Sequence, residues 1–199
     1  IEGTQTITYT NNAPSELGYL WLQMDQNLFA PGSRGEAVVP QDARFSGFFE
    51  NGGYDISNLR IEHNGTTYTP EHIIDDTRMR VDLDAPLAAE GDSLALTMDF
   101  SFELPDYGAD RMGMFDSEDG TVYQLAQWYP RMYVYDDVNG WNVLPYLGQG
   151  EYYLEYGQFD LDITVPHDFI VTATGALQNP EAVLTSTQQE RLSEAEQSR

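Results

Sequence analysis

The strongest pattern in this sequence is an alternation of apolar and polar residues. Over residues 94–104 every second residue is apolar, namely Leu94, Leu96, Met98, Phe100, Phe102 and Leu104. Successive side chains of a β-strand point to opposite faces of a sheet, so this run predicts a strand with one apolar face. Shorter runs of β-branched, aromatic and aliphatic residues predict further strands at residues 4–10, 17–28, 59–63, 66–68, 79–83, 152–165 and 170–177.

Turn-forming pairs separate several of these runs. Asn64-Gly65 lies between residues 59–63 and 66–68, and Asp119-Gly120 ends a loop rich in glycine and aspartate. Both pairs tolerate the positive φ angles of a tight hairpin connection. Short strands joined by such turns predict an all-β fold built from antiparallel sheets.

Residues 123–146 form the most aromatic stretch of the chain. They include two of the three tryptophans, several tyrosines and a turn-forming Asn139-Gly140 pair. We expect a hairpin whose arms are strands, with Gln124, Gln127 and Arg131 on one arm. Such a hairpin is either a dense piece of the core or the wall of a binding surface.

The last part of the chain has a different pattern. Thr185 and Gln188 have the spacing of a capping box, in which each residue hydrogen-bonds the other's backbone at a helix start. Residues 188–197 are polar, contain good helix formers and have no wide apolar stripe. We therefore expect a β domain over residues 1–180 and a short, mostly exposed helical tail or linker over residues 181–199.

The charge and hydropathy of the chain exclude several partners. It has 33 acidic and nine basic residues among 199, for a formal net charge of −24. A surface of this sign repels phosphate groups, which argues against nucleic acid and anionic membranes as partners. No run approaches the roughly 20 apolar residues that span a bilayer.

Two features bear on redox chemistry and on the compartment. The chain has no cysteine, which excludes disulfides, thiolate zinc sites and a cysteine nucleophile. The first residues lack the basic and apolar regions of a signal peptide. The sequence leaves the compartment open, with a periplasmic or secreted location as one option.

Several motifs resemble those of a known family. The chain reads QWYPR at residues 127–131, YDD at 135–137, GWN at 140–142 and PYLG at 145–148. These motifs are similar to the amino-terminal domain of aminopeptidase-N-type zinc metallopeptidases (membrane alanyl aminopeptidases, of the gluzincin group), and most of all to a bacterial branch. The likeness extends to residues 9–12, 160–166 and 171–175 and to Asn179-Pro180, so it covers nearly the whole chain.

The resemblance implies a fold and a function. In that family the first domain is a saddle-like or sandwich arrangement of antiparallel sheets, is not catalytic, and leans on a separate catalytic domain. The resemblance therefore implies a domain that shapes the substrate cleft and packs against the catalytic domain of the same polypeptide. It also implies that this chain is inactive by itself and binds no cofactor, whereas the full-length protein is a zinc aminopeptidase.

The metal would lie outside this sequence. In the family the zinc-binding motif HExxH and its downstream glutamate belong to the second domain. His63, His72 and His167 are scattered and lack the i, i+4 spacing that places two ligands on one helix face. The local spacing therefore predicts no metal ligand and no catalytic residue in this chain.

The resemblance also implies a substrate-binding residue. The family's first domain presents a glutamine or glutamate, near a strand end, to the peptide's amino terminus or first side chain. Matching Ala126-Gln127 assigns Gln127 to this role, whereas counting back from Arg131 favours Gln124. On one strand these two glutamines would face opposite sides. We predict Gln127 as the substrate-binding residue and keep Gln124 as the second candidate.

The chemistry of a glutamine suits this role, but a structural role is open too. A carboxamide can accept a hydrogen bond from a substrate ammonium and also donate one. The alternative is that Gln127 only pins a neighbouring strand or loop. We interpret Trp128 and Trp141 as core residues, and we expect Arg131 to pair with Asp136 or Asp137.

Two other classes of function compete with this hypothesis. An aromatic-rich β-sandwich could be a carbohydrate-binding module, which needs two or three coplanar exposed rings to stack on sugars. A hydrolase using paired carboxylates such as Glu151 and Glu155 is a weaker alternative, because so acidic a chain produces close pairs by chance. Burial of the aromatic rings would separate the first alternative from the peptidase hypothesis.

The basic residues lead to a testable prediction about salt. All nine are arginines, and this lysine-free, acidic composition indicates adaptation to high salt, although an acidic lineage short of lysine is the simpler alternative. Molar salt shortens the Debye length to about 3 Å and screens the self-repulsion of the chain. We expect the thermal unfolding midpoint to be higher in 2 M potassium chloride than in dilute buffer. The midpoints can be measured by circular dichroism. Equal midpoints in the two solutions would contradict an adaptation to high salt.

Overall fold

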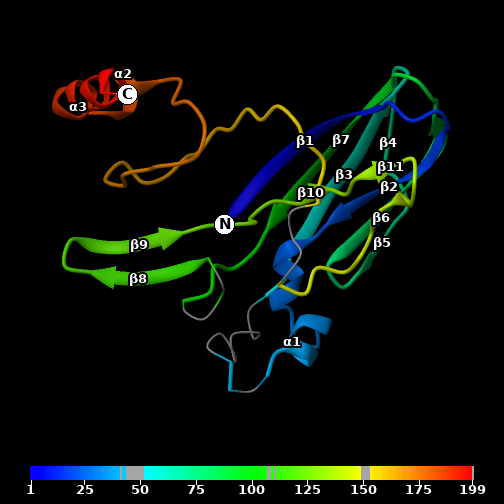
Figure 1. Cartoon of the computed structure of the whole chain (residues 1–199), viewed down its shortest axis with the longest axis horizontal. Coiled ribbons are helices and arrows are strands. Elements are labelled where there is room, and N and C mark those ends of the chain that lie inside the picture. Colours follow the sequence, from blue (N-terminus) through cyan, green and yellow to red (C-terminus); the bar gives the residue numbers. More distant parts are fainter. Residues whose placement is uncertain (41, 44–51, 107–108, 110, 149–152, 199) are drawn as a thin grey trace. The chain divides into compact units, whose positions relative to one another are not determined.

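A computed structural model describes residues 1–40, 42–43, 52–106, 109, 111–148 and 153–198 (Figure 1). The chain divides into two compact units, residues 1–157 and residues 158–199. The expected boundary at residue 180 falls inside the second unit. The first unit contains all the strands and the second contains the two C-terminal helices.

The first sheet of unit one has four antiparallel strands in the order β1-β7-β3-β4. They are β1 (Glu2–Asn11), β7 (Asp92–Ser101), β3 (Asp55–His63) and β4 (Thr66–Tyr68). The pairing of β1 with β7 is uninterrupted from Glu2↔Ser101 to Asn11↔Asp92. The predicted turn at Asn64-Gly65 is confirmed, since these residues join β3 to β4 at φ angles of 51° and 75°.

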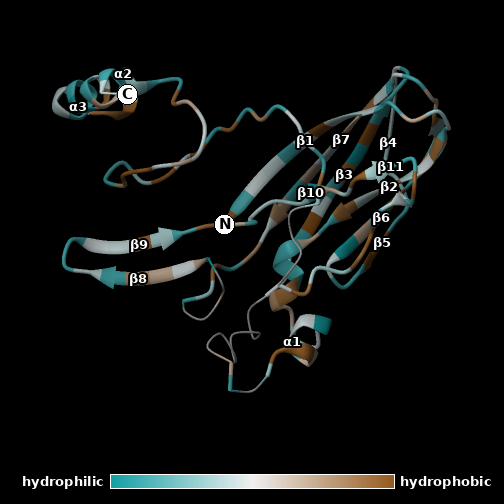
Figure 2. Cartoon of the chain, in the orientation of Figure 1, coloured by the Kyte–Doolittle hydropathy of each residue, from teal (hydrophilic) through white to brown (hydrophobic). Residues whose placement is uncertain are grey.

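The second sheet also has four antiparallel strands, in the order β10-β2-β6-β5. They are β10 (Arg131–Met132), β2 (Leu17–Gln23), β6 (Arg78–Leu87) and β5 (His72–Asp75). Figure 2 shows hydrophobic residues interleaved with hydrophilic ones along the strands. Buried residues of both sheets, among them Leu20, Val81, Ile61 and Leu96, form one hydrophobic core. The predicted all-β class with antiparallel sheets is thus confirmed.

The strand expected over residues 17–28 is shorter than predicted. It ends at Gln23, and a 3₁₀ helix, η1 (Asp25–Phe29), follows directly. All five residues of η1 are buried, because Asp25 and Gln26 bind polar groups in the interior, while Leu28 and Phe29 enter a second hydrophobic cluster with Phe100 and Phe102. A short helix, α1 (Arg34–Val38), comes next in the chain.

The aromatic stretch does not form one long hairpin, so the prediction of two strand-like arms is wrong. Its residues are shared among β9 (Gly120–Gln124), which pairs with β8 (Gly113–Ser117), the short β10, and a small hairpin of β11 (Tyr135–Asp136) and β12 (Gly140–Trp141). A bend at positive φ at Gln127, followed by Pro130, interrupts the first arm. The turns before Gly120 and Gly140 are confirmed by their registers, Ser117↔Gly120 and Asp136↔Gly140.

The second unit contains helices α2 (Pro180–Val183) and α3 (Ser186–Gln197). The capping box of Thr185 and Gln188 is formed, and none of the residues of α3 is buried, as predicted. Strands were also expected over residues 152–165 and 170–177. This prediction is wrong for residues 158–177, which contain no strand, and residue 152 lies outside the described part. A strand requires a hydrogen-bonded neighbour, and the isolated bridge found among the described residues near this region, Tyr133↔Leu154, lies before residue 158. No helix in the described residues is both long enough and apolar enough to cross a bilayer.

Truncation of Leu96 tests the core. This residue is 0% exposed and lies on the central strand β7 between Ile7 and Ile61. We expect Leu96→Ala to lower the free energy of unfolding by about 2–5 kcal/mol, through lost burial and the cavity left behind. Thr97→Ala, which changes the opposite face of the same strand, should cost less than about 1 kcal/mol. Comparable losses in the two variants, measured by urea unfolding, would argue against this core.

Candidate functional site

The two candidate glutamines lie in different environments. Gln124 is the last residue of β9, opposite Gly113, and its side chain is exposed. Gln127 lies three residues later in a bend with φ of 52°, a left-handed conformation that non-glycine residues adopt at a cost of about 1–2 kcal/mol. They do not share a strand, so their spacing does not place them on opposite faces of one sheet.

Hydrogen bonds from distant parts of the chain hold Gln127. Its main-chain oxygen accepts one from Gln26 Nε2 at 2.9 Å and a longer one from the Tyr54 hydroxyl at 3.5 Å. Its side-chain Oε1 accepts one from the Tyr146 hydroxyl at 3.1 Å. Its Nε2 is buried and has no hydrogen-bond partner in the part of the chain that the structure describes. Backbone strain and unsatisfied buried groups are uncommon and often mark functional sites. Asp76 shares both features, with a φ of 58° and an Oδ2 that is buried without a partner among the described residues, but only Gln127 lies in the segment with the family resemblance.

A buried ion pair anchors the end of the same segment. The Arg131 guanidinium donates to both carboxylate oxygens of Asp25, with Nε–Oδ2 and Nη2–Oδ1 distances of 3.0 and 2.5 Å. Asp25 is 1% exposed and also accepts from Gln23 Nε2 at 2.8 Å. Burial raises the pKa of Asp25, and the hydrogen bonds and charge of Arg131 oppose that rise. The expected pairing of Arg131 with Asp136 or Asp137 is wrong, because β10 pairs with β2 and brings Arg131 to the end of that strand.

A further bond ties residues 127–131 to the first sheet. Gln5 Nε2, on β1, donates to the main-chain oxygen of Pro130 at 2.9 Å. The segment is therefore bound by β1, by η1 and by the Tyr146 side chain. These bonds reduce the ways in which Gln127 can move relative to the two sheets.

The sequence analysis missed the residues that hold Gln127. Gln26 and Asp25 lie 101 and 106 positions from their partners Gln127 and Arg131, so no local spacing signals them. The only local signal is that two polar residues, Asp25 and Gln26, directly follow an apolar strand. The strand predicted over residues 17–28 includes both of them.

The tryptophans pack against other rings, as expected for residues of the core. Trp128 contacts Tyr129 edge-on, with ring centroids 4.9 Å apart, and it lies beside Phe100. Trp141 contacts Tyr135 edge-on at 5.4 Å and lies beside Tyr9. All three tryptophans are half-buried. In the described part of the chain they form no flat, exposed shelf of the kind that a carbohydrate-binding module requires.

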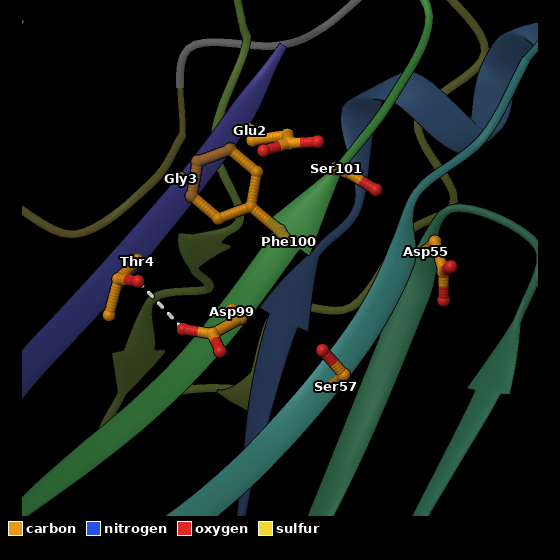
Figure 3. A pocket seen from close by; sticks show the side chains of 8 residues that line it. All are labelled: Glu2, Gly3, Thr4, Asp55, Ser57, Asp99, Phe100 and Ser101. Atoms are coloured by element: carbon orange, nitrogen blue, oxygen red, sulfur yellow. Dashed lines mark hydrogen bonds between the residues drawn. The ribbon is translucent and has the colours of Figure 1, made fainter. Parts of the chain in front are cut away.

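A shallow hollow of about 440 Å³ lies away from both glutamines, at one end of β1, β3 and β7 (Figure 3). Its lining includes Glu2, Thr4, Asp55 and Asp99. The Asp99 carboxylate accepts hydrogen bonds from Asn58 at 2.6 Å and Thr4 at 2.7 Å, which lower its pKa. Both oxygens of Asp99 are therefore engaged in hydrogen bonds.

The histidines and acids do not assemble a metal site in the described residues. His63 is buried and lies 2.9 Å from Asp92, His72 is on β5, and His167 belongs to the second unit. No group of three potential ligands occurs in the described residues. Of the carboxylate pair considered above, Glu151 lies outside these residues, and Glu155 accepts a hydrogen bond from the Tyr135 amide. The residues present therefore do not fit a zinc ion, and no step through a metal is assigned to them.

Comparisons of this chain with protein-family models, with curated proteins and with solved structures found no match.

Asp136 organises the turn that follows the candidate segment. Its carboxylate accepts hydrogen bonds from the Asn139 amide at 2.7 Å, Asn142 Nδ2 at 2.8 Å, the Tyr153 hydroxyl at 2.9 Å and the Val138 amide at 3.0 Å. These bonds, of which that from Asn139 contributes most, lower the pKa of Asp136 from 3.8 to about 2. The ionised carboxylate is therefore the form that stabilises this turn.

The lowered pKa sets a pH dependence. A carboxyl whose pKa is lower in the folded state contributes stability at pH values above its ordinary pKa and loses it as the pH falls through the folded value. We expect this contribution to be present above pH 3.8 and to disappear towards pH 2. NMR titration of the Asp136 side-chain carbon should give a midpoint near 2, and Asp136→Asn should weaken the fall in stability between these pH values. Asp137→Asn is the control, and an ordinary titration midpoint for Asp136 would contradict the turn geometry.

Proposed function

We propose that this chain is the non-catalytic amino-terminal domain of a zinc-dependent aminopeptidase, and that it shapes the substrate cleft. The observation that carries this proposal is the state of Gln127. Its backbone is held in a left-handed conformation, and its side-chain nitrogen is buried without a partner among the described residues. Strain and unmet hydrogen-bonding capacity concentrate at binding sites. They occur here at the residue that the family resemblance assigns to the peptide's amino-terminal end.

The side-chain nitrogen of Gln127, unpaired within the described part of the chain, indicates which group of the peptide it would contact. Its Oε1 already accepts a hydrogen bond from Tyr146, so the group left over is a donor. A donor suits a carbonyl oxygen of the peptide, whereas a substrate ammonium needs an acceptor. This nitrogen is buried in the chain alone, so the residues around it would have to move when the peptide binds.

Exposed apolar residues support the second part of the proposal, a catalytic domain packed against this chain. The β8–β9 hairpin is a separate two-stranded sheet in which the cross-strand pair Phe115 and Val122 is exposed. A hairpin of two strands is marginally stable in water by itself. In the second unit Leu161, Ile163 and Val165 alternate as in a strand and are exposed as well. Burial under another module would stabilise both regions.

In the proposed full-length protein the zinc belongs to the catalytic domain, where it would activate a water for attack on the first peptide bond. The residues of this chain would contribute binding and orientation. Gln127 would donate to the peptide, and Gln124, at the end of the exposed hairpin, is the second candidate for contact.

Substitution of the two glutamines in the longer polypeptide tests the proposal. We expect Gln127→Ala to raise KM for aminoacyl-anilide substrates roughly tenfold, because about 1–1.5 kcal/mol of binding is lost, with kcat changed less. Gln124→Ala compares the second candidate with the first, and it should change KM by less than about threefold. The 199-residue chain alone should release no anilide with or without added zinc. Hydrolysis by the chain alone would contradict the non-catalytic assignment, and an unchanged KM in Gln127→Ala would remove Gln127 from the site.

A further inference from the structure

Two hydrogen bonds act directly on the main-chain carbonyl of Gln127. Gln26 is 2% exposed, and its Nε2 lies 2.9 Å from the main-chain oxygen of Gln127 and 3.5 Å from Met112 Sδ. The Tyr54 hydroxyl reaches the same oxygen only at 3.5 Å. The Gln26 bond is the shorter of the two, so it contributes more to holding this carbonyl.

Gln26 is itself well anchored. It lies in η1, whose five residues are all buried, and its chain neighbour Asp25 is bound by Arg131 and Gln23. Arg131 in turn belongs to the segment that contains Gln127. The segment over residues 127–131 is therefore joined to η1 at two points. The Asp25–Arg131 pair holds its last residue, and the Gln26 bond holds its first residue, Gln127.

These contacts lead to an inference about orientation. The carbonyl of Gln127 belongs to the peptide unit that joins it to Trp128, so a bond to this oxygen fixes ψ of Gln127 and φ of Trp128. The positive φ of Gln127 is allowed only together with a left-handed ψ, so holding ψ also favours this φ. We infer that Gln26 is a positioning residue, which holds Gln127 in its left-handed conformation and so decides where the Gln127 side chain points. Tyr146 then selects the carboxamide orientation by donating to Oε1, which leaves Nε2 as the open donor.

The consequence for binding rests on the function proposed above. If Gln127 binds the peptide, Gln26 acts on KM without touching the substrate. Loss of the Gln26 bond would release the Gln127 peptide unit from a conformation that a non-glycine residue otherwise avoids. The side chain would then be displaced from the cleft even though the sheets stay folded.

NMR spectroscopy of the 199-residue chain tests the positioning directly. A residue with positive φ shows a strong intraresidue NOE between its amide and α protons. We expect this signal at Gln127 in the unchanged chain and its loss in Gln26→Met, which keeps the side-chain length and removes the donor. The matched control is Asn11→Leu, which removes another buried amide, 1% exposed, whose Nδ2 donates to the main-chain oxygens of Ser15, Leu87 and Ala88 instead. In that variant the Gln127 signal should remain.

A second variant keeps the test decisive if Gln26→Met folds poorly. Tyr54→Phe removes the longer bond to the same oxygen and should leave the Gln127 signal in place. Persistence of the signal in Gln26→Met, or its loss in Tyr54→Phe, would overturn the assignment of this role to Gln26.

Kinetics in the longer polypeptide separate this inference from the proposed function. We expect Gln26→Met to raise KM for aminoacyl-anilides roughly tenfold, as Gln127→Ala does, with Asn11→Leu near the unchanged value. An unchanged KM in Gln127→Ala would count against the proposed function, while the NMR comparison would still decide the role of Gln26. A raised KM in Gln127→Ala together with an unchanged KM in Gln26→Met would overturn the positioning role alone.

Discussion

The buried ion pair of Asp25 and Arg131 is the interaction on which the candidate site depends. Removing one partner of such a pair leaves a charge in the interior and typically costs about 3–5 kcal/mol, whereas the intact pair needs good geometry to offset its desolvation. Here the geometry is bidentate, and Gln23 supplies a further donor to the carboxylate. The pair joins the end of β2 to the start of β10. Because of this connection, Gln26 comes within reach of the Gln127 carbonyl.

The two sheets and the candidate segment differ in how they are stabilised. The sheets depend on area, since residues such as Leu20, Val81 and Leu96 are fully buried in one shared core. The segment over residues 127–131 depends on a few polar contacts with buried groups. Polar contacts of this kind are directional, so they hold a single side-chain position that nonspecific apolar packing would not. A rigid β scaffold with one polar-braced bend is a suitable way to present a binding residue.

The exposed apolar residues support the same proposed function as the bend at Gln127. Phe115 and Val122 form an exposed cross-strand pair on the β8–β9 hairpin, and Leu161 and Ile163 in the second unit alternate as in a strand but are exposed. The proposed catalytic domain would supply a cover for these residues.

The sequence by itself determined β1, β4 and β7 and parts of β2, β3 and β6, because alternation along residues 94–102 and the Asn64-Gly65 pair are local signals. It did not predict β5, and it placed β10 in a longer hairpin arm. It also determined the capping box at Thr185 and placed Gln127 among the candidates. Only the tertiary structure decided that Arg131 pairs with Asp25, that η1 interrupts the strand expected over residues 17–28, and that Gln127 lies in a braced bend. Those outcomes depend on contacts between residues about 100 positions apart, and nothing in the local pattern encodes which of many acids and amides will meet.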